Sequence, residues 1–443
     1  MNYRKVLRWS IIVALGGFLF GLDTAVISGC EKTIQQLWNL SDAMIGQVVA
    51  MALYGTVVGA IFGGIPAQSI GRKNTLFWIA LTYLVSAIGC ALAPGASALM
   101  FFRFLGGLAI GASSVVAPMY ITEISPSEKR GQLTAMFQFN IVFGILVAYF
   151  SNWLIGAADP EAWRWMLGVV AIPSMVFVIL ILSVPESPRW LILKKDATTE
   201  ALAILKIINP ATAQQSLAEI ETSRHAKTET SGFAEFFSGK YSFPIWLAFL
   251  FAFFNQVSGI NAVIYYAPRI FEDAGLAKSS ALLSSVGIGV VNLFFTMLGL
   301  AWIDKFGRRF LMFIGSIGYI VSLTLVALFF LKGTSDGGMT VPILLFVFIA
   351  AHAIGQGAVI WVFISEIFSN QVRSFGNSFG SSTHWVFAAL IASTFPLLAG
   401  RFGQAPIFAF FAAMMCFQLL FVWKMMPETK GVSLEDLEKR LVK

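Results

Sequence analysis

Apolar residues along this chain occur in long runs, which short polar or glycine- and proline-containing segments interrupt. Twelve such runs lie near residues 9–29, 43–68, 75–93, 98–121, 133–156, 164–184, 244–270, 280–303, 310–331, 341–367, 376–400 and 406–426. A helix of roughly 20 apolar residues crosses the hydrocarbon core of a bilayer, whereas a membrane β-barrel needs alternating segments of about ten. The pattern therefore predicts an all-α membrane protein with twelve transmembrane helices.

The one long polar stretch, residues 185–240, divides the apolar runs six and six. It contains the segment "TEALAILKI", whose apolar spacing is typical of a helix, so we expect short helices in this linker. The expected organisation is an N-terminal half at 1–184, a cytoplasmic linker at 185–240, a C-terminal half at 241–427 and a short cytoplasmic tail at 428–443.

Composition agrees with a membrane location and charge sets the orientation. Hydrophobic residues make up 57% of the 443 positions and charged residues 12%, with a formal net charge of +7. The basic residues gather at alternate helix ends, at Arg4, Lys5, Arg8, Arg72, Lys73, Lys129, Arg130, Arg189, Lys194, Lys195, Lys305, Arg308 and Arg309. Because cytoplasmic loops carry the excess of Lys and Arg, this predicts a multi-pass protein of the cell (inner) membrane with both termini cytoplasmic.

The basic residues form no single patch, so we expect no nucleic-acid partner. The three cysteines, Cys30, Cys90 and Cys416, have no spacing typical of a metal site or a disulfide framework. We expect no metal, no cofactor and no enzymatic activity, since the chain also has no phosphate-binding loop and no arrangement for a nucleophile.

Three motifs recur in the two halves. "SIGRKNTL" at 69–76 corresponds to "KFGRRFLM" at 305–312, and "YITEISPSEKR" at 120–130 corresponds to "VFISEIFSNQVR" at 362–373. "PESPRW" at 185–190 corresponds to "PETKGV" at 427–432. Parallel repeats of this kind are typical of alternating-access transporters, which bind their substrate between the halves.

With "GFLFGLDTAVISG" at 17–29, "RFLGG" from Arg103, "AWRWML" at 162–167 and "QVSGINAVIYYAP" at 256–268, these motifs cover nearly the whole chain. Together they resemble the sugar porter family of the major facilitator superfamily, and bacterial proton-coupled monosaccharide symporters for xylose, glucose, galactose or arabinose in particular. The resemblance implies the major facilitator fold, with two six-helix halves and an intracellular helical linker.

Asp23 is an acid within the first apolar run, where an unpaired charge costs several kcal/mol. It is either a permanent partner of a buried cation or a carboxyl that takes up a proton during transport, and the residues alone favour neither. Arg103 in the fourth run is the candidate partner. The family resemblance implies that Asp23 and Arg103 form the proton-coupling pair of a symporter.

The seventh run contains the amides Asn255, Gln256 and Asn261. Amides both donate and accept hydrogen bonds, which suits a neutral polyhydroxy ligand, although bonds between helices are the alternative. We expect Ser258-Gly259 to break the helix, so that Gln256 and Asn261 face one cavity. The resemblance implies that these amides bind sugar.

The resemblance also assigns sugar-binding positions outside the seventh run, namely Phe20, Gln138, Asn292, Trp361 and His384. For Trp361 the alternative is an anchor at the membrane interface. His384 stands where close relatives carry Gln, and it is either a pH-sensitive group or a neutral contact for sugar or water. Tyr265 resembles an extracellular gate.

Charged residues of the repeated motifs are expected to hold the cytoplasmic side closed. They are Glu123, Arg130, Glu186, Asp304, Arg308, Glu366, Arg373 and Glu428. The alternative is a set of solvated loop charges, which contribute little individually. Gln68 stands where the second half has Asp304, so the two halves are expected to differ in strength.

The function that this sequence favours is import of a monosaccharide with a proton by alternating access. The alternative is a facilitative sugar uniporter with the same binding site. A sugar sensor or a drug antiporter is less favoured, because no signalling extension is evident and the amides suit a hydrated ligand. The expected partners are the monosaccharide, the proton and the lipid bilayer, with a monomer as the functional unit.

Overall fold

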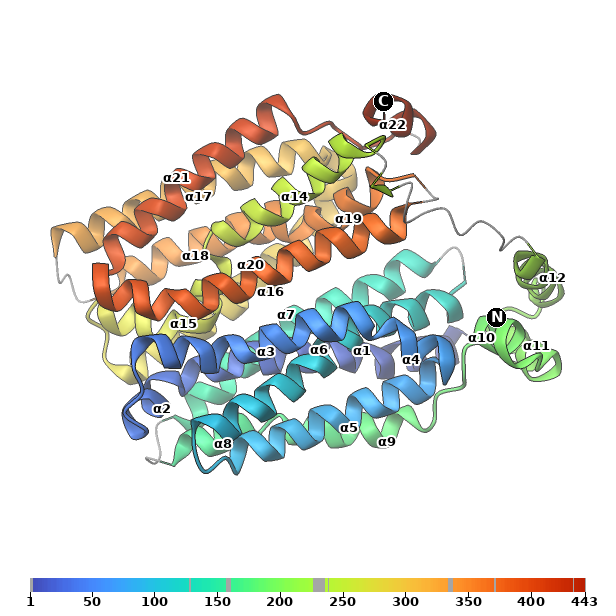
Figure 1. Cartoon of the computed structure of the whole chain (residues 1–443), viewed down its shortest axis with the longest axis horizontal. Coiled ribbons are helices and arrows are strands. Elements are labelled where there is room, and N and C mark those ends of the chain that lie inside the picture. Colours follow the sequence, from blue (N-terminus) through green and yellow to red (C-terminus); the bar gives the residue numbers. More distant parts are fainter. Residues whose placement is uncertain are drawn as a thin grey trace. The chain divides into compact units, whose positions relative to one another are not determined.

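The computed structural model describes residues 3–126, 129–156, 161–225, 236–237, 239–333, 338–369, 372–432 and 434–442. Within these ranges the secondary structure is helical (Figure 1). Twelve helical segments are long and apolar enough to cross a membrane, which confirms the predicted fold class. Each of them corresponds to one of the twelve apolar runs in the sequence.

Nine α-helices and a 3₁₀ turn precede the linker in the described residues, and all of them except α2 belong to the first six spans. They are α1 (Tyr3–Val26) with η1 (Ile27–Gly29), α2 (Glu31–Leu37), α3 (Asp42–Phe62), α4 (Gly64–Ser69), α5 (Arg72–Ala91), α6 (Ala96–Ile124), α7 (Arg130–Ile155), α8 (Ala162–Gly168) and α9 (Ala171–Ile181). Of these, the short helix α2 follows the first span and lies outside the membrane-spanning segments.

The linker residues that the structure describes up to His225 form three short helices, as predicted: α10 (Pro188–Lys195), α11 (Thr198–Ile208) and α12 (Ala213–His225). The helix α11 buries Ala201, Ile204, Leu205 and Ile208, and the first three of these lie in the segment "TEALAILKI". The helix α10 begins with Pro188 directly after Ser187, whose side chain accepts a bond from the Trp190 N–H. It contacts α4 and α6.

The second six spans are α14 (Ser242–Val257) with α15 (Ile260–Asp273), α16 (Lys278–Phe306), α17 (Arg308–Lys332), α18 (Thr340–His352) with the π-helical turn η3 (Ala353–Gly357) and α19 (Ala358–Glu366), α20 (Arg373–Phe402) and α21 (Gln404–Lys424). A last short helix, α22 (Leu434–Leu441), follows them.

The chain forms two compact units. Unit 1 comprises Met1–Thr24, Met51–Ala148 and Arg164–Glu229, and unit 2 comprises Ala25–Ala50, Tyr149–Trp163 and Thr230–Lys443. Unit 2 therefore includes α2 and adjoining ends of α1, α3 and α7 from the first half of the sequence. The expected domain boundaries at 184, 240 and 427 stay predictions.

In unit 1, glycines bring α3 and α6 into backbone contact. A Cβ on Gly107 would lie 2.0 Å from the carbonyl oxygen of Ala52, and one on Gly55 would lie 2.2 Å from that of Phe104. Gly59 and Gly111, one turn further along each helix, make the reciprocal contacts at 2.3 and 2.2 Å. Small residues four apart are the usual means of close helix packing in membranes, where the hydrophobic effect adds little.

Substitution of Gly107 by alanine tests this packing. We expect Gly107→Ala to force α6 away from α3 and to lower the stability of the folded protein by about 1–3 kcal/mol, because the added methyl group overlaps a backbone oxygen. The measurement is the thermal unfolding temperature of the purified protein in detergent.

The matched control is Gly64→Ala, because a Cβ built on Gly64 would meet no atom within 4 Å apart from its chain neighbours and the adjoining backbone of its own helix. This control should unfold at or slightly above the wild-type temperature, since alanine has the higher helix propensity. Equal unfolding temperatures for the two variants would contradict the proposed contact.

Candidate functional site

Asp23 lies in α1 of unit 1 and faces α5 and α6. Its side chain is buried, and Arg103 of α6 is buried as well. A Cβ on Gly106, which is three residues after Arg103 and on the same face of α6, would lie 3.6 Å from Oδ2 of Asp23. Arg103 interacts electrostatically with the Asp23 carboxylate, and the carboxylate in turn interacts electrostatically with the side chain of Tyr83 in α5. The structure thus brings the two predicted coupling residues into one buried environment.

Oδ2 of Asp23 accepts no hydrogen bond from the described residues. A buried carboxylate oxygen without a donor is costly, whereas a protonated carboxyl carries no charge and can itself donate. This environment therefore suits a carboxyl that gains and loses a proton. It also fits a lasting electrostatic partnership with Arg103, so the role of the pair stays a prediction.

The predicted helix break in the seventh span is present at Ser258-Gly259. Gly259 has a φ of +85°, which a glycine adopts without strain and which separates α14 from α15. Across the break, Nδ2 of Asn261 donates to Oε1 of Gln256 at 2.6 Å. Nε2 of Gln256 donates to Oδ1 of Asn255 at 2.9 Å. The break thus joins three amides that a straight helix would point apart.

His384 of α20 lies against this amide cluster of Asn255, Gln256 and Asn261. Nε2 of Gln256 is 3.2 Å from each of the two imidazole nitrogens. Because an amide nitrogen can only donate, the imidazole nitrogen that faces it accepts and carries no proton. The Trp361 ring lies 5.0 Å from the His384 ring, centroid to centroid. The contact with Gln256 favours the neutral one of the two roles predicted for His384.

The other predicted sugar positions lie in both units. Phe20 of α1 and Gln138 of α7 are half-buried in unit 1. Asn292 of α16 is buried in unit 2, where its Oδ1 accepts a bond from Thr296 at 3.3 Å. Trp361 of α19 is 37% exposed in unit 2. A sugar-binding role for these four residues stays a prediction.

The repeated charged motif of the first half forms what we call the Arg72 cluster, made of Arg72, Lys73, Glu123, Glu186 and Ser187. The guanidinium of Arg72 binds both carboxylate oxygens of Glu123, at 2.8 and 3.0 Å. Glu186 accepts backbone N–H bonds from Arg72, Lys73 and Ser187, at 2.8 to 3.2 Å. Burial raises the pKa of Glu186, and the three N–H donors oppose this rise. The cluster ties the start of α5 to the ends of α6 and α9.

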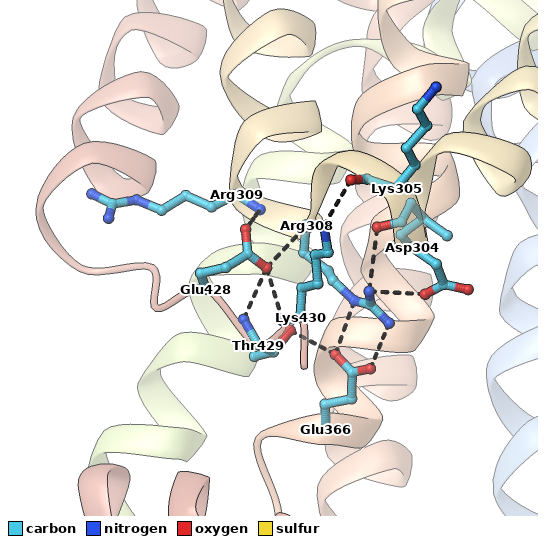
Figure 2. Close-up of polar contacts among 9 residues, drawn as sticks. Asp304, Lys305, Arg308, Arg309, Glu366, Glu428, Thr429 and Lys430 are labelled. Carbon is cyan, nitrogen blue, oxygen red and sulfur yellow. Dashed lines mark hydrogen bonds and ion pairs between the residues drawn. The ribbon is translucent and has the colours of Figure 1, made fainter. Parts of the chain in front are cut away.

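The second half forms the matching Arg308 cluster, made of Asp304, Arg308, Arg309, Glu366, Glu428 and Thr429 (Figure 2). Arg308 binds both carboxylate oxygens of Glu366, at 2.8 and 3.2 Å. Glu428 accepts the N–H groups of Arg308 and Arg309, each at 3.0 Å. Arg308 also binds Asp304 at 3.0 Å, for which the Arg72 cluster has no counterpart because residue 68 is Gln. The two clusters therefore differ by one ion pair, and the predicted difference in their strength stays a prediction.

In both clusters each arginine binds a glutamate of its own half, so these bonds hold the helices of one half together. Arg373 donates to the carbonyl oxygen of Phe368 in the same segment. The structure describes the backbone of Arg130 but not its side chain. A gating role for the charged residues stays a prediction.

Sequence reasoning missed Arg72, Ser187 and Thr429 as members of these clusters. Arg72 and Arg308 both follow the Gly of the repeated "GR" pair, and Ser187 and Thr429 both follow the Glu of "PES" and "PET". The hydroxyl of Ser187 binds Glu123 at 2.5 Å, and that of Thr429 binds Glu366 at 2.6 Å. The sequence repeat itself was thus the signal that identifies all three.

At the opposite ends of the spans, unit 2 contains a second ionic group, the α2–α15 cluster. Arg269 of α15 binds both carboxylate oxygens of Glu31 in α2, at 2.6 and 2.8 Å, and it also binds Gln35. Lys32 forms a more exposed ion pair with Glu272 at 2.5 Å. Burial raises the pKa of Glu31, and Arg269 opposes this rise. Sequence reasoning missed Glu31 and Arg269, because their pairing links distant segments and belongs to no motif.

Tyr265, the predicted extracellular gate, lies one helical turn before Arg269 in α15 and is 1% exposed. Close to it, the hydroxyl of Tyr149 in α7 donates to the carbonyl oxygen of Ile264 at 2.7 Å. These contacts place Tyr265 in the part of unit 2 where α15 meets segments from the first half of the chain. Its gating role stays a prediction.

Comparison with known proteins gives consistent matches over almost the whole chain. The family model described as "Sugar (and other) transporter" matches residues 9–441. The D-xylose transporter of Levilactobacillus brevis is 36% identical over 433 residues, which cover 97% of this chain and 94% of that protein. The arabinose-proton symporter of Bacillus subtilis (strain 168) is 36% identical over 446 residues, covering 99% and 95%.

Among solved structures, the chain matches the major facilitator superfamily proton:xylose symporter XylE bound to 6-bromo-6-deoxy-D-glucose. The TM-score is 0.81 and the sequence identity 32%, and the match covers 100% of both chains.

The asymmetry between the charge clusters predicts unequal effects of one substitution. Glu123→Gln should lower stability by about 1–3 kcal/mol, because it leaves the largely buried Arg72 without a carboxylate. Glu366→Gln should cost less, since Arg308 keeps Asp304. Thermal unfolding of the purified variants in detergent measures the difference. In an Asp304→Asn background the cost of Glu366→Gln should rise to that of Glu123→Gln, and an unchanged cost would contradict this account.

The α2–α15 cluster predicts a change in the exposure of Cys30, which is buried beside Glu31. We expect Arg269→Met to increase the rate at which maleimide modifies Cys30 several-fold at pH 7.5, in a Cys416→Ser background. The substitution leaves Glu31 without its cation, so the cost of burying the ionised carboxylate is no longer offset.

The ratio of the Cys30 modification rate in Arg269→Met to that in wild type should fall as the pH falls. A raised pKa means that the closed arrangement holds the Glu31 proton more tightly than an open, hydrated one does, so acid favours the closed arrangement. Lys32→Met is the matched control and should change the rate little. Maleimide reacts with the thiolate, so the rates are compared as a ratio of Arg269→Met to wild type at each pH. A ratio of one, or a ratio that increases toward acid pH, would contradict the proposed link.

Proposed function

The chain belongs to the sugar transporter family, and on this premise we propose that it imports a monosaccharide together with a proton by alternating access. The relatives named above carry xylose or arabinose in their names, so aldopentoses are the first substrates to test. The observation that carries the proton part of the proposal is the environment of Asp23.

Asp23 supports proton coupling because its carboxyl is buried, close to one fixed cation and short of a hydrogen-bond donor. Arginine keeps its charge in proteins, so Arg103 favours the ionised form of any carboxyl beside it. Burial favours the neutral form. A small shift of α1 against α6 changes the balance between these two effects, and with it the affinity for a proton.

The amide cluster supports a neutral, hydrogen-bonding substrate. Asn255, Gln256 and Asn261 present donors and acceptors without net charge, and His384 faces Gln256 with an unprotonated nitrogen. An aromatic face such as that of Trp361 packs against the apolar side of a sugar ring. We propose that Phe20, Gln138 and Asn292 complete the sugar site.

We further propose that both termini, the linker helices and the two arginine clusters are cytoplasmic, and that the α2–α15 cluster is extracellular. The distribution of Lys and Arg between the helix ends supports this orientation. The functional unit that we propose is a monomer in the cell (inner) membrane.

The variant Asp23→Asn tests the coupling. One proton entering down 100 mV contributes about 2.3 kcal/mol, which supports roughly 50-fold accumulation of sugar. We expect Asp23→Asn to lose this accumulation and to retain exchange of labelled for unlabelled D-xylose across the membrane, since the amide site is unchanged. Uptake and counterflow in proteoliposomes measure the two activities separately.

The matched control is Asp196→Asn, which makes the same chemical change at an exposed carboxylate of the linker, at a left-handed position that asparagine also adopts. It should keep both accumulation and exchange. Accumulation at the wild-type level in Asp23→Asn would contradict proton coupling through Asp23 and favour a facilitative uniporter in which Asp23 and Arg103 are structural partners.

A further inference from the structure

The amide cluster is one end of a longer row of buried polar groups in unit 2, which we call the amide chain. It runs from α15 and α14 through η3 to α21 and α17. Its members are Asn261, Gln256, Asn255, Gln356, Gln418 and Ser316. The last three belong to no motif that the sequence or the family assignment singles out.

Every bond in the amide chain donates in the same direction. Asn261 donates to Gln256 at 2.6 Å, and Gln256 donates to Asn255 at 2.9 Å. Asn255 then donates to Gln356 at 3.3 Å. Gln356 donates to Gln418 at 2.7 Å, and Gln418 donates to Oγ of Ser316 at 2.8 Å. Each amide after Asn261 thus receives a bond on its oxygen, and every amide gives one from its nitrogen.

A backbone carbonyl sets this direction. The hydroxyl of Ser316 donates to the carbonyl oxygen of Met312 at 2.7 Å, and a carbonyl can only accept. With its hydrogen used in this bond, Ser316 offers Gln418 a lone pair, so the nitrogen of Gln418 must face it. The same constraint passes from one amide to the next, because in an apolar interior each unmade bond costs about 1–3 kcal/mol.

Burial makes the constraint effective. Gln256, Gln356, Gln418 and Ser316 are each 0% exposed. Water therefore cannot replace a lost partner in the middle of the chain. Bonds that run head to tail also polarise one another, so a chain with one common direction is more stable than one with a reversal.

The π-helical turn η3 places Gln356 in this row. A π turn shifts the residues after it by one position around the helix, and such turns often occur at functional sites. The backbones of η3 and α17 also pack closely here, as shown by a Cβ on Gly315 of α17, which would lie 3.0 Å from Cα of Gly355. The side chain of Gln356 is thus held between Asn255 on one side and Gln418 on the other.

At the open end of the chain, Oδ1 of Asn261 accepts no bond from the residues that the structure describes. The side chain is 8% exposed, whereas the far end of the chain is fully buried. With the direction fixed, Asn261 offers an acceptor at this end. In the reversed direction it would offer its NH₂ group instead.

We propose that Gln356, Gln418 and Ser316 are positioning residues that fix the direction of the amide chain, so that Asn261 presents its carbonyl oxygen to a sugar hydroxyl, which donates to it. This inference rests on the proposed function, since it takes a sugar as the ligand. It adds a determinant of specificity that lies in η3, α21 and α17 and acts on the sugar through the amides of α14 and α15.

The test compares D-xylose with its monofluoro analogues, because fluorine replaces a hydroxyl at similar size but cannot donate. Binding to the purified protein is measured by tryptophan fluorescence, with L-arabinose and D-glucose alongside. In the wild type, fluorination at one ring position should weaken binding roughly tenfold, because Oδ1 of Asn261 loses its donor.

Gln418→Met and Ser316→Ala each remove the bond between residues 418 and 316 that fixes the direction of the hydrogen bonds in the amide chain. In both variants Asn261 can turn its NH₂ group to the sugar, so the penalty at that ring position should fall to roughly threefold or less. Gln418→Glu is the matched control, because a protonated glutamic acid accepts from Gln356 and donates to Ser316 as glutamine does. It should keep the wild-type penalty.

A purely structural role would weaken the binding of all sugars in proportion and leave the ratio of fluorinated to parent sugar unchanged. That result, in either releasing variant that binds D-xylose, overturns the inference while the proposed function stands. Failure of the wild type to bind any of the three sugars overturns the proposed function and this inference together.

Discussion

A polar group in the hydrocarbon core of a bilayer finds no water, so it must be satisfied by the protein itself. Much of this structure follows from that constraint. The buried amides of the second half, for example, bond to one another in a continuous row. Several buried side-chain atoms of the described residues depart from this rule, and Oδ2 of Asp23 is the carboxylate oxygen among them, which supports the proposal that a proton binds there.

The ionic clusters at the helix ends differ in ways that fit a transport cycle. The Arg72 and Arg308 clusters each combine a bidentate arginine–glutamate ion pair with backbone N–H bonds to a second glutamate. Each cluster holds the helices of its own half together. The Glu31–Arg269 pair instead links α2 to α15 across a long stretch of sequence. A buried ion pair gains little net free energy after desolvation, so such a link can break and form again within one cycle.

The sequence predicted the parts of this account that depend on local pattern. Twelve apolar runs, the helical linker, the break at Ser258-Gly259 and the extra carboxylate at Asp304 were all visible in it. It did not reveal Gln356 and Gln418 as partners, because their bond joins residues of different helices and the π turn that orients Gln356 has no sequence signal. Glu31 and Arg269 were missed for the same reason, whereas the internal repeat contained enough information to identify Arg72.

The central claim is that sugar and proton enter together. Its most direct test is the external pH of a suspension of energy-depleted cells, or of proteoliposomes, when D-xylose, L-arabinose or D-glucose is added to the wild-type protein. The account predicts that the medium becomes more alkaline with at least one of these sugars, because each sugar molecule that enters removes a proton from outside. Entry of labelled sugar without any change in external pH would contradict it.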